Sequence, residues 1–255
     1  MKLHANVFGS GTPFIILHGF LGMGDNWKTL GKKIADKGYE VHLVDQRNHG
    51  RSPHSDDFTY SLLAQDLEVY CNDNNLKTII LLGHSMGGKT AMYFASNTSI
   101  EITHLLIADI GSKFYPQHHQ DILLGLETLN ATTLTSRSEA DTMLKEFVRE
   151  VGTRQFLLKN LYWKSKEQLG LRVNLEALMA NSNEIGKELP SDYLYQGTTL
   201  FLKGDRSNYI LAEDKPRIKL QFPNAKFTEI SKAGHWLHAE NPKEFLTEVL
   251  GFINK

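Results

Sequence analysis

The stretch GHSMGGKT, residues 83–90, fits two patterns that imply different chemistries. As G-x-S-x-G, it places Ser85 at the apex of a sharp strand-to-helix turn, where a serine acts as a nucleophile. As G-x-x-x-x-G-K-[ST], it forms a phosphate-binding loop in which Lys89 and Thr90 contact phosphate and magnesium. Both patterns require a strand before and a helix after, so other parts of the chain must decide between them.

A nucleophilic serine needs a general base and two donors for the oxyanion that forms during attack. The stretch KAGHWLH near the end of the chain supplies His235 as the base. One backbone N–H donor comes from the residue after the serine, which is Met86. The second comes from a loop after an early strand, and HGFLG (18–22) makes the N–H of Phe20 the candidate.

The phosphate-binding interpretation has no role for the early His-Gly pair or for the late histidine. Such a loop also commonly follows the first strand of its domain, whereas two predicted strands and two predicted helices precede Gly83. We therefore favour the nucleophile interpretation, in which Lys89 and Thr90 serve only solvation and helix packing. Neither S-x-x-K at Ser85 nor H-E-x-x-H occurs in the chain, so we expect no metal and no cofactor.

The bulk composition is that of a soluble globular protein. The 255 residues are 41% hydrophobic and 22% charged, with a formal net charge of −1. This balance gives no electrostatic reason to expect nucleic acid or an anionic membrane as a partner. The single Cys71 excludes an intrachain disulfide, and no apolar window is long enough for membrane insertion. We expect a cytoplasmic protein that acts on a small molecule.

Short apolar runs alternate with amphipathic segments through the first half of the chain. Runs that end in a polar or glycine turn are typical of strands buried on both faces, and this alternation predicts a mostly parallel α/β sheet. The predicted strands cover 13–19, 39–47, 77–85 and 102–110, and the predicted helices cover 25–38, 59–75 and 87–99.

After Asp109 the pattern changes to a helical period with no predicted strand. We expect residues 1–111 and 193–255 to form the core, with 112–192 inserted as a helical cap, or lid. The core then continues with a predicted strand at 198–205, a helix at 213–221, a strand at 225–231 and a closing helix. Asn241 is the predicted N-cap of that helix and Pro242 its first residue.

Five stretches together make the chain resemble the α/β-hydrolases, and more narrowly the small bacterial YbfF-type esterases and thioesterases. The resemblance implies an eight-stranded, mostly parallel sheet with helices on both faces and an inserted helical cap. It also implies a serine hydrolase that cleaves carboxylic esters or thioesters, including acyl-CoA. The five stretches are HGFLGMGDNW (18–27), VDQRNHGRS (44–52), GHSMGGK (83–89), QFLLKNL (155–161) and AGHWLHAENP (233–242).

Spacing alone does not identify the acid that orients His235, because the chain departs from the usual superfamily pattern. After the strand at 198–205, GDRS places Ser207 where an Asp is expected and Asp205 two positions early. The resemblance to the YbfF group instead implies the Asp of LLIADI, Asp109. We take Asp109 as the first choice and Asp205 as the alternative.

Other residues near these motifs have structural interpretations. We expect Asp45 and Arg47 to form a charge-assisted pair that holds the turn of DQRNHGRS. His18 and His84 are expected to make structural hydrogen bonds. Most aromatic residues of the cap should pack in its own core, with a subset lining an acyl pocket. They are Phe114, Tyr115, Phe156, Tyr162 and Trp163.

Two other functions fit the same fold. A lyase or C–C bond enzyme of the menaquinone-synthase type would act on a polyanionic substrate and would favour an arginine-rich cap. A catalytically retired binding protein would lack part of the Ser, His and acid set, which is complete here. The cap holds only four arginines, Arg137, Arg149, Arg154 and Arg172.

Overall fold

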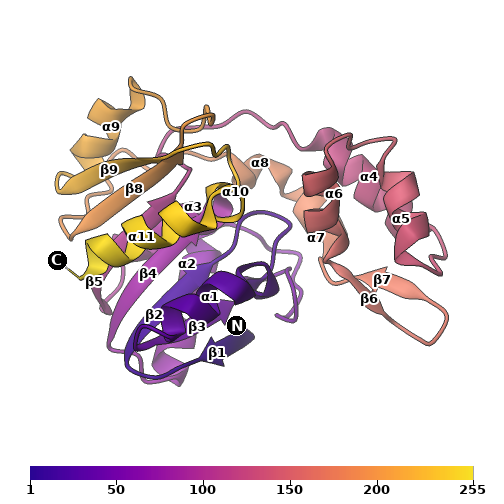
Figure 1. The fold of residues 1–255 in the computed structure, drawn as a ribbon, viewed down its shortest axis with the longest axis horizontal. Helices are drawn as coiled ribbons and strands as arrows, with labels where there is room; N and C mark the ends of the chain where they lie inside the picture. Colours follow the sequence, from indigo (N-terminus) through magenta and orange to yellow (C-terminus); the bar gives the residue numbers. More distant parts are fainter. Residues whose placement is uncertain (255) are drawn as a thin grey trace.

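The computed structural model describes residues 1–254 and is built on a seven-stranded sheet (Figure 1). The strand order is β1-β3-β2-β4-β5-β8-β9, and only the β1–β3 pair is antiparallel. The strands are β1 Ala5–Phe8, β2 Thr12–Leu17, β3 Tyr39–Val44, β4 Thr78–His84, β5 Glu101–Ala108, β8 Thr199–Gly204 and β9 Ala225–Ile230. The mostly parallel α/β sheet that the alternating pattern predicts is confirmed.

Helices cover both faces of the sheet, as Figure 1 shows. Alternate residues of β2 enter different cores, because successive side chains of a strand point to opposite faces. Phe14 and Ile16 pack with α1 and α11, whereas Ile15 and Leu17 pack with α2 and α3. The core helices are η1 Gly24–Trp27, α1 Lys28–Ala35, α2 Tyr60–Asp73, α3 Met86–Ala95, α9 Asp214–Gln221, α10 Leu237–Glu240 and α11 Pro242–Ile253.

The sheet has seven strands in the part of the chain that the structure describes, not the eight that the resemblance implies. The residues before β1 do not form a strand, although the His4 carbonyl accepts the N–H of Asp45, just after β3, over 2.9 Å. The amino group of Met1 contacts the carboxylate of Asp66, and the His4 N–H donates to Ser52 Oγ over 2.9 Å. β1 itself is only four residues long, too short for its sequence pattern to predict.

The segment 112–192 lies between β5 and β8 in the chain, and its elements gather to one side of the sheet in Figure 1. The expectation that it contains no strand is wrong, because β6 and β7 form an antiparallel hairpin. Each of these strands has three residues, which is too short for the alternating pattern of a strand to be recognised in the sequence. Its elements are α4 Gln120–Ala131, α5 Arg137–Leu144, α6 Val151–Leu158, β6 Leu161–Trp163, β7 Leu169–Leu171, α7 Leu175–Ala180 and α8 Ser182–Ile185.

The closing helix begins as predicted. Pro242 is its first residue, and the Asn241 side chain accepts a hydrogen bond from the Glu244 N–H over 3.3 Å. An Asn cap satisfies one of the N–H groups that the first helical turn leaves free. Within residues 1–254, none of the helices combines the length and apolar character that crossing a membrane demands.

Candidate active site

Ser85 sits on a tight turn between β4 and α3. Its φ of 52° and ψ of −118° lie in a region that non-glycine residues rarely adopt. Such backbone strain clusters at functional sites, where the surrounding structure enforces it. The neighbouring glycines permit the turn. A Cβ on Gly83 would lie 2.2 Å from the Gly87 carbonyl oxygen, and one on Gly87 would lie 2.4 Å from that of Leu17.

His235 lies in the loop between β9 and α10 and contacts both other members of the predicted set. Its Nε2 is 3.0 Å from Ser85 Oγ, and its Nδ1 is 2.8 Å from Asp109 Oδ2. Because a carboxylate only accepts hydrogen bonds, Nδ1 carries the proton and Nε2 is free to accept the hydroxyl hydrogen of Ser85. The Tyr209 ring stacks on the imidazole at 3.8 Å and 16°, a contact that no sequence motif indicated.

Asp109 follows β5 and is fully buried, with a left-handed φ of 51°. Its Oδ1 accepts the Gly204 N–H over 3.1 Å. Its Oδ2 accepts from His235 and also from the hydroxyl of Ser207. Three donors therefore surround a carboxylate that burial separates from water, as a buried charge requires. Ser207, at the position where the superfamily pattern has Asp, is a partner of the acid in this chain.

Asp205, the alternative acid, makes no contact with His235 among the hydrogen bonds of the described residues. Its carboxylate accepts the N–H groups of Lys232 over 2.8 Å and Ala233 over 2.9 Å. These backbone hydrogen bonds lower the pKa of Asp205 from its ordinary value. Asp205 thus holds the loop that leads to His235, and the structure brings Asp109, not Asp205, to the imidazole.

The HGFLG loop lies directly against the serine turn. A Cβ on Gly19 would lie 2.9 Å from His84 Nδ1 and 3.3 Å from the Cβ of Ser85, so a larger residue there would have to displace these neighbours. Phe20 follows Gly19 in this loop, and Met86 is the first residue of α3. The N–H groups of a first helical turn lack partners within the helix and carry its positive dipole end. Phe20 lines the same cavity as Ser85, and Met86 follows Ser85 directly in the chain, so the residues of both candidate oxyanion donors meet at the serine.

His18 and His84 make structural hydrogen bonds, as predicted. His18 Nδ1 donates to the Gly19 carbonyl over 2.8 Å, and its Nε2 accepts the Gln46 N–H over 3.0 Å. His84 Nε2 donates to the carbonyl of His235 over 2.8 Å and so holds the backbone of the predicted base. Burial lowers the pKa of His18 to about 4 and that of His84 well below its ordinary value, so both rings are neutral at pH 7.

The expected pairing of Asp45 with Arg47 is wrong. Arg47 forms a bidentate pair with Asp66 of α2, at 2.6 Å and 3.0 Å. The oxygens of Asp45 are already taken by backbone, because they accept the N–H groups of Gly24 over 2.7 Å and Arg51 over 2.9 Å. The Asp66 carboxylate reaches Arg47 because α2 packs against the sheet, and the sequence around Arg47 does not reveal this packing.

Lys89 is not solvated, contrary to the expectation for this residue. Its side chain has no exposed surface, and its Nζ donates to the carbonyls of Lys113 over 2.7 Å and Lys187 over 2.6 Å. These two carbonyls lie near the two ends of the inserted segment. Burial lowers the pKa of Lys89 to about 7. Lys89 therefore ties α3 to both connections of 112–192.

A cavity of about 230 Å³ opens at Ser85. Phe156 and Leu157 of α6 contribute to its wall, so one of the five cap aromatics lines it as anticipated. Phe114 and Trp163 are exposed, at 56% and 52%, and do not pack in a cap core. The lining residues are Gly19, Phe20, Leu21, His84, Ser85, His118, His119, Ile122, Thr153, Phe156, Leu157, Tyr209, His235 and Trp236.

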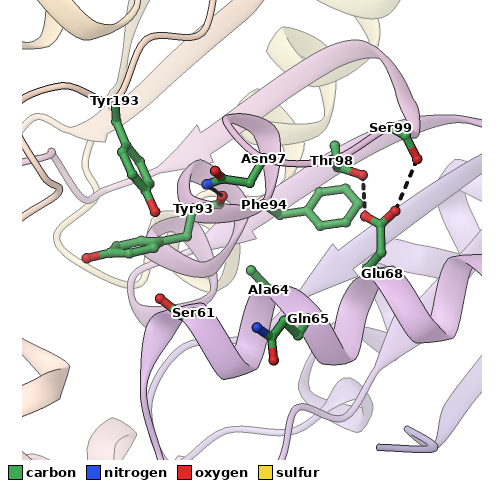
Figure 2. A pocket seen from close by; sticks show the side chains of 10 residues that line it. All are labelled: Ser61, Ala64, Gln65, Glu68, Tyr93, Phe94, Asn97, Thr98, Ser99 and Tyr193. Atoms are coloured by element: carbon green, nitrogen blue, oxygen red, sulfur yellow. Dashed lines mark hydrogen bonds between the residues drawn. The ribbon is translucent and has the colours of Figure 1, made fainter.

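A larger hollow of about 490 Å³ lies between α2 and α3, where Figure 2 shows Tyr93 and Tyr193 near one end and Glu68 near the other. Ser85 does not line it. The Glu68 carboxylate accepts hydrogen bonds from Thr98 and Ser99, so its oxygens have partners. Among its described lining residues, no nucleophile is paired with a base, and size alone does not make the hollow the substrate site.

Comparison with known proteins defines the class. A family profile described as the alpha/beta hydrolase fold matches residues 12–242. The chain belongs to the α/β-hydrolase fold family. Its narrower resemblance to the YbfF group is confirmed by a match to the esterase YbfF of Escherichia coli, at 28% identity over 95% of this chain and 93% of that protein.

Other relatives are similar over nearly the whole chain. The zebrafish (Danio rerio) protein named sn-1-specific diacylglycerol lipase ABHD11 is 35% identical over 96% of this chain and 79% of its own length. A solved structure titled marine microorganism esterase superposes with a TM-score of 0.95. It shares 38% sequence identity and covers 99% of both chains.

Proposed function

We propose that this chain is an esterase that hydrolyses carboxylic esters through a covalent acyl-enzyme. The observation that carries the proposal is the continuous hydrogen-bonded series Ser85–His235–Asp109, with distances of 3.0 Å and 2.8 Å. This is the arrangement of nucleophile, base and orienting acid that acyl transfer requires. Relatives named esterase and lipase, at 28% to 38% identity, support hydrolysis of an ester.

In the proposed mechanism, Ser85 Oγ attacks the ester carbonyl while His235 Nε2 takes the hydroxyl proton. Asp109 keeps the imidazole in the correct tautomer and stabilises the imidazolium. The N–H groups of Phe20 and Met86 hold the negative oxygen of the tetrahedral intermediate. The C–O bond to the alcohol then breaks, and His235 returns the proton to the departing alcohol. A water molecule activated by His235 releases the acid and restores Ser85.

We infer that residues 112–192 act as a cap over this site, on a core of 1–111 and 193–255. Phe156 and Leu157, from α6 of the inserted segment, line the cavity at Ser85. Lys89 and its two carbonyl partners fix the points at which the segment leaves and rejoins the core. An insertion fixed in this way restricts which acyl or alcohol groups can reach the serine.

The cavity favours an uncharged substrate. Its described lining is mostly apolar, and none of these residues is Lys or Arg. The phosphates of a CoA group would need cationic partners outside this lining. Thioesters, acyl-CoA among them, remain a prediction. A chain-length series of acyl esters tested alongside the matching acyl-CoAs addresses it, and we expect higher kcat/KM for the neutral esters.

The arrangement of the arginines does not favour a lyase that acts on a polyanion. Arg137 donates to the carbonyls of Leu158 and Leu161, and Arg154 pairs with Asp141. Arg172 lies over the Tyr162 ring at 4.6 Å. Among the described cavity residues there is no arginine to bind such a substrate.

Replacement of Ser85 tests the proposal. The substitution Ser85→Ala removes the nucleophile and keeps the Cβ, so the fold should be retained while turnover of p-nitrophenyl acyl esters is lost. Circular dichroism and thermal unfolding verify that the variant is folded. A folded Ser85→Ala protein with undiminished turnover would rule out the mechanism.

A further inference from the structure

The backbone of the HGFLG loop is held by side chains on both sides of Phe20. On the first side, the Gly19 carbonyl accepts from His18 Nδ1 over 2.8 Å and from the Gly22 N–H over 3.0 Å. A trans peptide is planar, with its C=O and N–H pointing in opposite directions. The two hydrogen bonds to the Gly19 oxygen therefore fix the direction of the Phe20 N–H, which belongs to the same peptide group.

On the second side, Leu21 is held at both of its polar backbone atoms. Its N–H donates to His49 Nε2 over 3.2 Å, and its carbonyl accepts from Asn160 Nδ2 over 2.8 Å. His49 and Asn160 have no exposed surface. Leu21 has a left-handed φ of 59°, a conformation that a leucine rarely adopts without support from its surroundings. The loop shape therefore depends on these two partners.

Asn160 belongs to the inserted segment, whereas the loop belongs to the core. It lies two residues after the end of α6, and its Nδ2 also donates to the Leu157 carbonyl over 3.1 Å. Both partners are carbonyl oxygens, so the amide must present its nitrogen to them. Leu157 lines the cavity at Ser85, and so does Phe156 beside it. One buried amide thus connects the cavity-lining helix to the loop that carries Phe20.

We propose that Asn160 is a positioning residue for ester hydrolysis, which aligns the Phe20 N–H with the oxyanion only while α6 is seated on the core. The inference rests on the proposed function, because it assigns a task to the loop beside Ser85. Asn160 itself does not touch the reacting atoms. Its effect should appear where charge develops in the transition state, and much less in binding of the uncharged ester.

Removing the amide should therefore lower kcat more than it raises KM. Loss of an oxyanion donor costs about 100- to 1,000-fold in kcat, and misalignment of a retained donor costs less. We expect Asn160→Ala to lower kcat by about 10- to 100-fold, with KM within about threefold of the wild type. The inhibition constant of a trifluoromethyl ketone, which forms a tetrahedral oxyanion on Ser85, should rise by a similar factor.

Asn181 offers a matched control in the same segment. Its Nδ2 donates to the core carbonyl of Asp56 over 2.9 Å and to the carbonyl of Ala177 over 2.8 Å. It therefore repeats the contact pattern of Asn160, with one carbonyl in the core and one in the preceding helix, but neither partner belongs to the HGFLG loop. We expect Asn181→Ala to leave kcat and the inhibition constant within about twofold of the wild-type values. A general loosening of the segment would instead lower kcat in both variants alike.

Thermal unfolding checks each variant. If Asn160→Ala does not fold, Asn160→Ser replaces it, because the shorter hydroxyl leaves a smaller void and still cannot span the distance to Leu21. A folded Asn160 variant with wild-type kcat and wild-type inhibition would overturn the inference, as would equal losses in the Asn160 and Asn181 variants. Either result leaves the proposed function intact if Ser85→Ala is inactive, whereas an active Ser85→Ala protein overturns the proposed function itself.

Discussion

The choice of Asp109 over Asp205 leads to a quantitative prediction for two matched Asp→Asn substitutions. In Asp109→Asn, the amide oxygen can keep the Gly204 N–H, which leaves the NH₂ group facing His235 Nδ1 and Ser207. Two donors then oppose each other unless the imidazole changes to the tautomer with its proton on Nε2. In that tautomer Nε2 cannot accept the proton of Ser85.

The expected loss in kcat for Asp109→Asn is about 10⁴-fold, equivalent to about 5 kcal/mol of transition-state stabilisation. Asp205→Asn keeps one acceptor for the loop N–H groups of Lys232 and Ala233 and leaves the contact between Asp109 and His235 in place. Because only the loop loses a hydrogen bond, we expect a loss of about tenfold or less.

Initial rates with p-nitrophenyl butyrate over a range of concentrations give kcat and KM for both variants. Circular dichroism and thermal unfolding confirm that each is folded. The assignment of Asp109 would be refuted if folded Asp109→Asn kept kcat within tenfold of the wild type. It would equally be refuted if Asp205→Asn lost as much activity as Asp109→Asn.

Three further substitutions test the packing around the site. Burial lowers the pKa of Lys89 from 10.5 to about 7, so the folded chain binds fewer protons than the unfolded chain between these pH values. The free energy of unfolding of the wild type should therefore rise relative to that of Lys89→Met as pH increases through this window, by at most about 1.4 kcal/mol per pH unit. Urea unfolding of both proteins at several pH values measures this difference. A difference that stays constant with pH would contradict this. A Cβ on Gly87 would lie 2.4 Å from the Leu17 carbonyl oxygen. Gly87→Ala should therefore lower the free energy of unfolding by about 1–3 kcal/mol and should also lower kcat. Wild-type values of both quantities would disprove the close packing. Ser207→Ala removes one of the three hydrogen-bond donors to Asp109. We expect kcat to fall by less than about tenfold, because His235 keeps its contact with Asp109. A loss as large as that of Asp109→Asn would assign Ser207 a larger role.

Most of the sheet could be predicted from sequence because its strands are buried on both faces. The runs at 77–85 and 102–110 contain the unbroken apolar stretches IILL (79–82) and LLIA (105–108), each followed by a turn, which is a strong local signal. The strands that the local sequence pattern does not predict are short. β1 has four residues, and β6 and β7 have three each, so their pairing depends on neighbours in space and not on their own pattern.

In the candidate site too, some features follow from the local sequence and others depend on neighbours in space. The types and motifs of Ser85 and His235 indicated a nucleophile and a base, and the structure places them in contact. Spacing alone left Asp109 and Asp205 open, because they follow β5 and β8, which are neighbours in the sheet. The direction of each side chain, which depends on the backbone at each strand end, distinguishes the two carboxylates.

Residues that act through backbone atoms were the hardest to identify. His49 and Asn160 bind the N–H and C=O of Leu21, and Lys89 binds two carbonyls of distant segments. Backbone groups are present at every position, so no motif marks which one a side chain will reach. The partner of Arg47 was missed for a related reason, since Asp66 approaches it only when α2 packs on the sheet.

Labelling with a fluorophosphonate, followed by mass spectrometry of the intact chain and of its peptides, tests whether His235 makes Ser85 a reactive nucleophile. We expect one label per folded chain, located on Ser85. We also expect no label in Ser85→Ala and much slower labelling in His235→Ala, because the base activates the hydroxyl. Absence of labelling in the folded wild type would show that Ser85 is not an activated nucleophile and would indicate a binding protein on this fold. Magnesium-dependent binding of ATP by the unlabelled chain would instead support the phosphate-loop interpretation of residues 83–90.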